Sequence, residues 1–216
     1  MQITIREPGS AITHFIGMMM ALFAAVPLLV KAGVTSGARS LTAMAIFMAS
    51  MILLYGASTT YHSVNLTGRP LRIFRKLDHM MIFVLIAGSY TPVCLMVLGG
   101  KQGYTLLALV WGIALAGMFI KACWITCPKW FSSVIYISMG WVCLLVFGQL
   151  LSTLPTAAFL WLLAGGIVYT AGGIIYALKL PVFNSRHKDF GSHEVFHLFV
   201  MAGSVCHFIF MYVYVA

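Results

Sequence analysis

Charged side chains are scarce in this sequence. Asp, Glu, Lys and Arg together make up 8% of its 216 residues, whereas 62% are hydrophobic. A water-soluble domain of this length could not cover its surface with so few charges, so the composition indicates an integral membrane protein. The formal charge of +9 comes from basic residues in short connections between apolar runs, where they contact lipid headgroups and set topology. We therefore expect membrane lipids, and no nucleic acid, as partners.

Cysteines are few, and their positions do not suggest a disulfide framework. Each lies in or at the end of an apolar run: Cys94, Cys123, Cys127, Cys143 and Cys206. We expect free thiols, because a secreted disulfide scaffold places its cysteines in polar, loop-rich segments. Cys123 and Cys127 are four residues apart and could share a helical face and a metal ion. Thiols packed between helices are the favoured interpretation of this pair.

Long apolar runs, by contrast, fill the chain. A helix needs about 20 apolar residues to cross a bilayer, and seven runs are long enough: 12–30, 41–61, 79–98, 104–120, 131–149, 157–178 and 193–215. Helices are the expected form because each satisfies its own backbone hydrogen bonds within the hydrocarbon. The connections are short, so the sequence predicts one all-α domain over residues 1–216, a bundle of seven transmembrane helices with antiparallel neighbours.

The lysines and arginines orient this bundle. Most of the 13 fall on one side of the alternating connections: Arg6, Arg69, Arg72, Arg75, Lys76, Lys121, Lys129, Lys179, Arg186 and Lys188. The other side has Lys31, Arg39 and Lys101. By the positive-inside rule the richer side is cytoplasmic, so we expect a cytoplasmic N-terminus and, after seven spans, a C-terminus outside.

The same alternation brings polar side chains from separate spans to one depth. The second span ends with Ser58 and His62, the third begins at Asp78, and the seventh begins with His193 and His197, all at the predicted cytoplasmic face. His193 and His197 lie one helical turn apart, so both can reach one metal ion. Ionisable groups within membrane spans are expensive and usually face the bundle interior. Their clustering therefore predicts a functional site.

The residue types indicate the chemistry. Three neutral imidazoles, from His62, His193 and His197, would hold Zn²⁺ and leave its fourth tetrahedral position for water, as in catalytic zinc sites. Such a metal lowers the pKa of its water to roughly 7. Asp78 would accept or orient the water proton, and the Ser58 hydroxyl would bond the water or a developing oxyanion. A lipid amide or ester carbonyl entering from the membrane would complete the site. Ligand type alone leaves iron, cobalt, nickel and copper open.

Other interpretations of these residues remain. Asp78 could pair with Arg75 or Lys76 at headgroup level. Glu194 between the two histidines matches a soluble metalloprotease motif, but no acidic residue follows it to act as a third ligand. Ser192 is a suitable N-cap, and in the first turn Glu194 could instead interact with the helix dipole or with Lys188. The remaining helix-end histidines, His14, His187 and His207, are best explained as interfacial polar residues, whereas His79 stays open.

Proline and glycine inside two spans predict local irregularity. Pro92 lies within the third span and Gly172-Gly173 within the sixth. Proline permits a kink, and paired glycines permit close helix approach. Together these features could open an apolar cavity above the metal site, and ordinary helix packing explains them equally well.

Several short motifs, each present once, are spread along nearly the whole chain. They are Glu7-x-x-Ser10-x-x-Thr13-His14-x-x-Gly17, Ser58-x-x-x-His62, Asp78-His79, Ala87-Gly88-Ser89-Tyr90-Thr91-Pro92, Gly172-Gly173 to Pro181, and His193-x-x-x-His197 with Gly203-Ser204-x-x-His207. With them the sequence resembles a bacterial member of the hemolysin III family, within the progestin and adipoQ receptor group that includes the adiponectin receptors. One departure is Ser10, where the family pattern leads us to expect Asn; we expect it to affect the start of the first helix and not the metal site.

The resemblance implies a seven-helix protein of the bacterial plasma membrane. It also implies zinc on His62, His193 and His197, with Asp78 beside the metal-bound water and Ser58 nearby. Adiponectin receptors and the related alkaline ceramidases suggest hydrolysis of a lipid amide, with a role in membrane homeostasis. Fold analogy does not transfer a substrate.

Three function classes follow from the sequence. The first is a zinc-dependent hydrolase of a lipid amide or ester. The second is a non-enzymatic lipid-state sensor in which zinc only holds three helices together. The third is a pore-forming haemolysin, which the uniformly apolar spans disfavour because an aqueous pore usually needs polar groups across the bilayer.

Overall fold

The computed structural model describes residues 5–178 and 190–216, and this part of the chain is helical without strands. Seven of its helices are long and apolar enough to cross a membrane, which confirms the predicted fold class. The elements are α1 (Pro8–Thr35), α2 (Gly37–Ser63), α3 (Gly68–Pro92) with η1 (Val93–Leu98), α4 (Gly100–Cys123), α5 (Lys129–Gly140) with η2 (Trp141–Val146) and α6 (Phe147–Thr153), α7 (Thr156–Leu178), and α9 (Ser192–Phe210) with η3 (Met211–Val215).

The third helix starts earlier than hydropathy predicts. The apolar run begins at residue 79, but α3 begins at Gly68 and includes Arg69, Arg72 and Arg75. Charge opposes burial in hydrocarbon but not helix formation, because arginine is a good helix former. The first turns of α3 therefore extend a basic helical segment beyond the apolar span.

The third span also changes its helical form at its proline. The α-helical pattern of α3 ends at Pro92, and the chain continues as the π-helical segment η1. Proline lacks a backbone N–H and crowds the preceding turn, so the change in form has a local cause. The irregularity predicted at Pro92 is confirmed.

The fifth span consists of three pieces, where the sequence predicts one continuous helix over 131–149. The 3₁₀ segment η2 separates α5 from α6. Tyr90 of α3 compensates for the break, because its hydroxyl donates to the Gly140 carbonyl over 2.6 Å and accepts from the Cys143 N–H over 2.9 Å. Backbone groups freed within the span thus find a partner on a neighbouring helix.

Very short connections make consecutive helices antiparallel neighbours. Ser36 alone separates α1 from α2, and Gly99 alone separates η1 from α4. Gly99 and Gly100 have φ angles of 60° and 52°, a left-handed conformation that glycine adopts without steric cost. A larger side chain would strain this turn.

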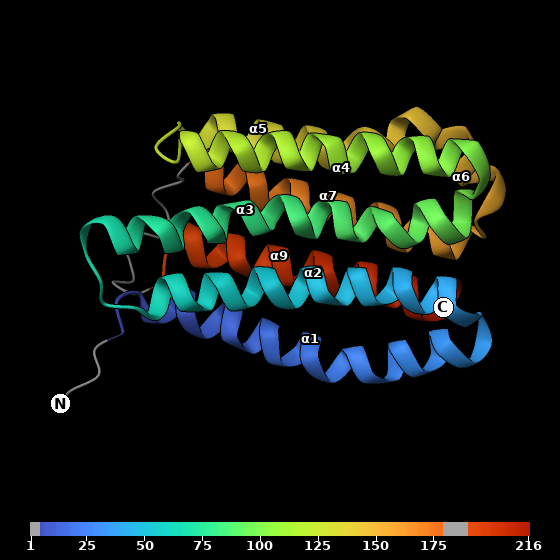
Figure 1. Cartoon of the computed structure of the whole chain (residues 1–216), viewed down its shortest axis with the longest axis horizontal. Coiled ribbons are helices and arrows are strands. Elements are labelled where there is room, and N and C mark those ends of the chain that lie inside the picture. The colour runs from blue at the N-terminus through green and yellow to red at the C-terminus, as the bar shows by residue number, and fades with distance from the viewer. Residues whose placement is uncertain (1–4, 179–189) are drawn as a thin grey trace.

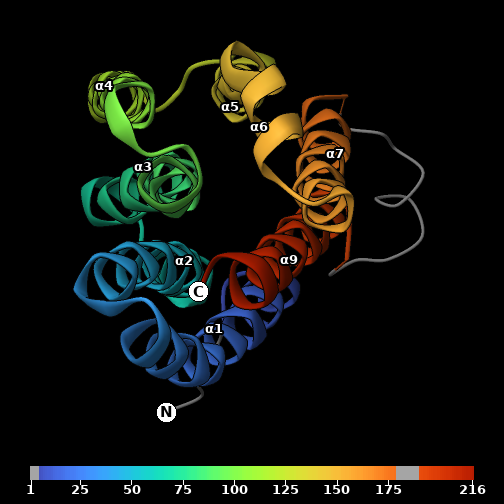
Figure 2. The ribbon, with the colours of Figure 1, turned by 90° about the vertical axis from the view of Figure 1, so that its right-hand side faces the viewer.

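The spans form a ring when seen along the bundle (Figure 2). Each of α1 to α4 lies beside the next, α5 packs on α7, α7 on α9, and α9 on α1. The first and last spans are therefore neighbours. The start of α1, the end of α2 and the starts of α3 and α9 lie at one end of the bundle (Figure 1), which is the convergence predicted from counting spans.

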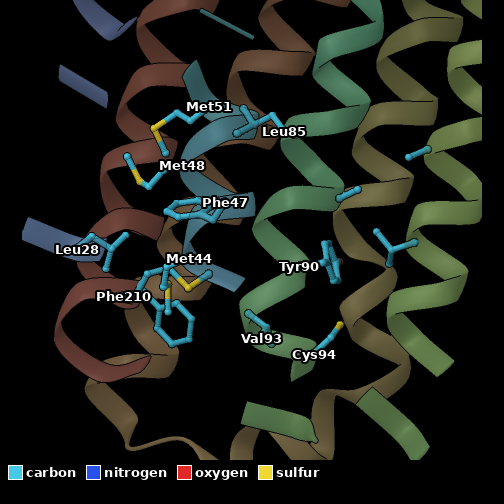
Figure 3. Packing of buried hydrophobic residues seen from close by; sticks show 14 of the residues in the cluster. Leu28, Met44, Phe47, Met48, Met51, Leu85, Tyr90, Val93, Cys94 and Phe210 are labelled. Atoms are coloured by element: carbon cyan, nitrogen blue, oxygen red, sulfur yellow. The ribbon is translucent and has the colours of Figure 1, made fainter. Parts of the chain in front are cut away.

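Large apolar side chains fill the opposite half of the bundle between α1, α2 and α9. Leu28, Met44, Phe47 and Phe210 are almost completely buried there and lie close together in Figure 3. Within a bilayer such side chains join helices through van der Waals packing. This packing joins the three helices that carry the polar residues described next.

Candidate metal centre

Three histidines from two helices meet at one end of the bundle. His62 lies in the last turn of α2, and His193 and His197 lie in the first two turns of α9. One nitrogen from each ring lies within 4.8 Å of the others, and the Nε2 atoms of His62 and His193 are 3.3 Å apart. The ring centroids are separated by 4.5 to 5.3 Å. The structure thus brings together the three predicted metal-binding residues.

This spacing fits a metal ion. Two imidazole nitrogens on one tetrahedral Zn²⁺ lie about 3.3 Å apart, given Zn–N distances of ~2.0–2.1 Å. His62 and His197 are each 2% exposed, so their rings are held away from water. An arrangement with three imidazoles can hold a tetrahedral cation and leave one coordination position to another ligand.

Two of the histidines are oriented by residues that precede or begin α1. The carboxylate of Glu7 contacts Nδ1 of His62, and the Thr13 hydroxyl lies 3.1 Å from Nδ1 of His197. A partner on Nδ1 fixes the ring orientation and directs Nε2 toward the metal. The hydrogen bond from His62 lowers the pKa of Glu7, although burial opposes this effect, so Glu7 is a carboxylate at neutral pH. The sequence interpretation assigned no role to Glu7 or Thr13.

Glu194 links the start of α9 to α1. Its carboxylate accepts the Gly191 N–H over 2.7 Å and is hydrogen-bonded by the Ser10 hydroxyl. The cap of α9 is therefore Gly191, and Ser192 is the first helical residue, so the predicted N-cap was wrong by one position. Ser10 was predicted to affect only the start of the first helix. In the structure it also contacts α9, because its hydroxyl donates a hydrogen bond to Glu194, the residue next to His193. Lys188, the alternative partner of Glu194, lies outside the described residues, as do Lys179, Arg186 and His187.

Asp78 and Ser58 are both buried near this end. Asp78 is 7% exposed, and its Oδ2 lies 3.3 Å from Nδ1 of His79. Among the ion pairs of residues 5–178 and 190–216, none joins Asp78 to Arg75 or Lys76. Ser58 is completely buried, and its hydroxyl has no hydrogen-bond partner within the described part of the chain. The predicted catalytic roles of these two residues stay predictions.

The predictions for His14 and His207 were wrong. His14 is 3% exposed and stacks on His197, with ring centroids 3.5 Å apart and planes within 8° of parallel. His207 lies between α9 and α7, with its ring against Gly165 and Tyr169. Both rings pack against neighbouring helices inside the bundle, where an exposed interfacial side chain was expected.

A largely apolar cavity of about 170 Å³ adjoins the histidines. Asp78, His193 and His197 line it, and it extends past Tyr90 and Phe159 toward His207. Next to its lining residue Gly173, α7 packs closely on α9: a Cβ on Gly172 would lie 2.6 Å from the Cβ of Phe199. The close approach predicted at Gly172 is confirmed, and the cavity reaches the metal-binding residues.

The cysteines are unpaired, as predicted. Cys123 and Cys127 do not share a helical face, however, because α4 ends at Cys123 and Cys127 lies in the following connection. The thiol of Cys127 instead accepts a hydrogen bond from the Lys121 ammonium over 3.1 Å. The prediction for Cys123 and Cys127 did not consider Lys121, a charged residue at the end of an apolar helix that needs a polar partner nearby.

Comparison with known proteins identifies the family. A family model described as Haemolysin-III related matches residues 2–208. Hemolysin-3 of Bacillus cereus is 36% identical over 214 residues, which cover 99% of this chain and 94% of that protein. The Hemolysin-3 homolog of Bacillus subtilis is 37% identical over 206 residues, or 95% and 92% of the two chains.

A more distant relative comes from the receptor group. The adiponectin receptor protein of Drosophila melanogaster is 22% identical over 237 aligned residues, covering 94% of this chain and 49% of that protein. With seven apolar spans, a full-length family match and bacterial relatives, this is a multi-pass membrane protein, consistent with a bacterial inner membrane. The chain belongs to the haemolysin III family.

Proposed function

We propose that the protein is a metal-dependent hydrolase of a membrane lipid amide or ester, with Zn²⁺ held by His62, His193 and His197. The observation that carries the proposal is the opening of this histidine cluster into an apolar cavity that also contains Asp78. A closed structural site would surround its metal with four protein ligands. Here the three histidines supply three.

Zn²⁺ held by His62, His193 and His197 would supply Lewis-acid chemistry, polarising a carbonyl and activating water near neutral pH. Glu7 and Thr13 hold the rings of His62 and His197 in position. The apolar walls of the cavity would bind an acyl chain. Membrane lipids are the natural source of such a chain, because the cavity lies within the spans.

Asp78 is the proposed general base. Its carboxylate lines the same cavity as His193 and His197, and it would accept the proton of the attacking water and return it to the leaving group. The Ser58 hydroxyl, which lacks a partner within the described residues, would donate a hydrogen bond to negative charge that develops on the carbonyl oxygen.

Metal analysis combined with turnover tests this proposal. Detergent-purified parent protein, His62→Ala, His197→Ala and the control His207→Ala would be loaded with zinc, dialysed and measured by elemental analysis. The same samples would be assayed on fluorescent lipid amides and matched esters. We expect zinc and turnover in the parent and retention of zinc in His207→Ala, with loss of both in the other variants. No bound metal in the parent would overturn the assignment.

A second candidate is a lipid-state sensor in which the metal is structural. The contacts that favour it join three helices: the metal-binding residues come from α2 and α9, and their partners Glu7 and Thr13 bring in α1. If the protein is a sensor, it would bind zinc and its thermal stability would change with lipid composition, but it would hydrolyse none of the lipid amides and esters tested.

A further inference from the structure

A second polar cluster lies where α4 ends and α5 begins. The ammonium group of Lys121 donates hydrogen bonds to the thiol of Cys127 and to the hydroxyl of Ser132, and the Cys127 sulfur lies 3.3 Å from the Ser132 oxygen. Lys121 is 2% exposed. None of these three residues belongs to the metal centre or lines its cavity.

The buried ammonium group needs a counter-charge. Within residues 5–178 and 190–216, no carboxylate forms an ion pair with Lys121. An unpaired charge in a low-dielectric site is costly, and the acidic partner that its contacts offer is the Cys127 thiol. Loss of the thiol proton converts this contact into an ammonium–thiolate pair, which stabilises both charges.

The position of Cys127 favours a reactive thiol. Burial raises its pKa, but the hydrogen bonds from Ser132 and Lys121 together with the Lys121 charge outweigh this effect, so the net shift is downward. Cys127 lies in the connection between two spans and is 7% exposed, close to the end of the bundle and outside the apolar helices. A thiolate beside a lysine at the edge of a protein is the usual setting of a reactive cysteine.

We propose that Cys127 is a site of covalent modification, a thiolate that Lys121 maintains and that reacts with small hydroperoxides at the membrane surface. Its sulfur attacks the terminal oxygen of the hydroperoxide, an S–O bond forms, and the O–O bond breaks. The sulfur is oxidised by two electrons to sulfenic acid, and the peroxide is reduced. The leaving alkoxide takes a proton from the Lys121 ammonium and departs as an alcohol.

The cluster has a route to the metal centre. The Lys121 ammonium lies 5.9 Å from the ring centre of Tyr136, whose hydroxyl donates to the backbone carbonyl of His79 over 3.0 Å. His79 follows Asp78 in the chain, and its Nδ1 lies 3.3 Å from the Asp78 carboxylate. Oxidation converts the ammonium–thiolate pair into two neutral groups, so the modification would change the charges near His79 and the proposed general base.

The pH dependence of alkylation tests the thiolate. The full-length protein in detergent would be treated with iodoacetamide between pH 5 and 10, and modification of each cysteine would be measured by mass spectrometry. The midpoint of the pH profile reports the pKa of the thiol. Limited access of the reagent to the sulfur lowers the rate of alkylation but does not move the midpoint. We expect a lower midpoint for Cys127 than for the exposed Cys123, a rise of the Cys127 midpoint in Lys121→Met, and its recovery in Lys121→Arg. Each unit of this rise corresponds to about tenfold less thiolate at neutral pH.

The oxidation step has its own readout. Parent protein treated with hydrogen peroxide or tert-butyl hydroperoxide would be trapped with dimedone, which labels sulfenic acid. We expect label on Cys127 before Cys123 and the buried Cys94. A Cys127 midpoint equal to or above that of Cys123 would overturn the proposal in the parent alone, whether or not the variants fold. Equal midpoints in parent and Lys121→Met, or dimedone label on the other cysteines first, would also overturn it.

Discussion

Glu7 and His62 are joined by two contacts. The backbone N–H of Glu7 donates to the His62 carbonyl over 3.0 Å, and the Glu7 carboxylate contacts Nδ1 of the same histidine. The residue before α1 is therefore fixed to the last turn of α2 through both main chain and side chain. This pairing fixes the orientation of the His62 ring, with Nδ1 toward Glu7 and Nε2 toward His193.

Replacing the Glu7 carboxylate tests this orienting role. Glu7→Gln keeps the size of the side chain but removes its charge, and loss of such a partner typically weakens metal binding about 10- to 100-fold. Competition for zinc with a chromophoric chelator measures the affinity. Arg39→Gln, at the other end of α2, is the control and should bind as the parent does. Equal affinities for parent and Glu7→Gln would show that the contact does not orient the ligand.

The general base can be separated from the metal site. Asp78→Asn should keep its zinc, because Asp78 is not one of the three ligands, but lose lipid hydrolysis by about 10²–10⁴-fold, the usual contribution of a general acid or base. Zinc content and turnover would be measured on the same preparation. Parent-level turnover in Asp78→Asn would remove Asp78 from the mechanism.

The stack of His14 on His197 predicts different results for two variants. Neither nitrogen of His14 has a hydrogen-bond partner within the described residues, so a phenyl ring can replace it, whereas His14→Ala loses an aromatic pair worth about 0.5–1.5 kcal/mol together with its packing. In detergent, the unfolding temperature should be lower for His14→Ala than for the parent and close to the parent value for His14→Phe. Loss of zinc from His14→Phe alone would mean that a His14 nitrogen takes part in metal binding.

Helix packing between α7 and α9 can be tested with two glycines of α7. A Cβ on Gly172 would lie 2.6 Å from the Cβ of Phe199, whereas one on Gly166 would meet nothing closer than Trp141 at 4.0 Å. Overpacking of this kind costs about 1–3 kcal/mol, so Gly172→Ala should lower the unfolding temperature. Gly166→Ala adds the same methyl group without the clash. A similar decrease in both variants would point to helix propensity or lipid contact instead.

The haemolysin name of the relatives invites a direct test for pore formation. The walls of the cavity are largely apolar, so the isolated protein should not conduct ions or small dyes. Liposomes containing the purified protein and a self-quenched dye should retain the dye as protein-free liposomes do. Dye release that scales with protein content would favour the pore-forming class over the hydrolase.

The cluster of His62, His193 and His197 could be predicted because two simple regularities bring these residues together. Residues four apart share a helical face, which pairs His193 with His197, and alternating spans place His62 at the same end. Glu7 and Thr13 could not be assigned in this way. Whether they reach His62 and His197 depends on the rotation of α1 about its own axis, which an apolar sequence does not specify.

The break in the fifth span shows a similar limit. The apolar run across Gly140 is uninterrupted, so hydropathy predicts one helix. The structure forms a 3₁₀ segment there because Tyr90, on another helix, satisfies the backbone at Gly140 and Cys143. Such compensation involves residues far apart in the sequence and becomes visible only when the helices are placed side by side.

The neighbouring position of the first and last spans has a consequence for biosynthesis. The contact between Glu7 and His62 needs only α1 and α2, but the contacts of Ser10 with Glu194 and of Thr13 with His197 need α9. During translation, two of the three histidines are therefore missing until the final span is inserted. A nascent chain truncated before residue 192 would hold one imidazole of the trio, so metal retention would report that synthesis of the bundle is complete.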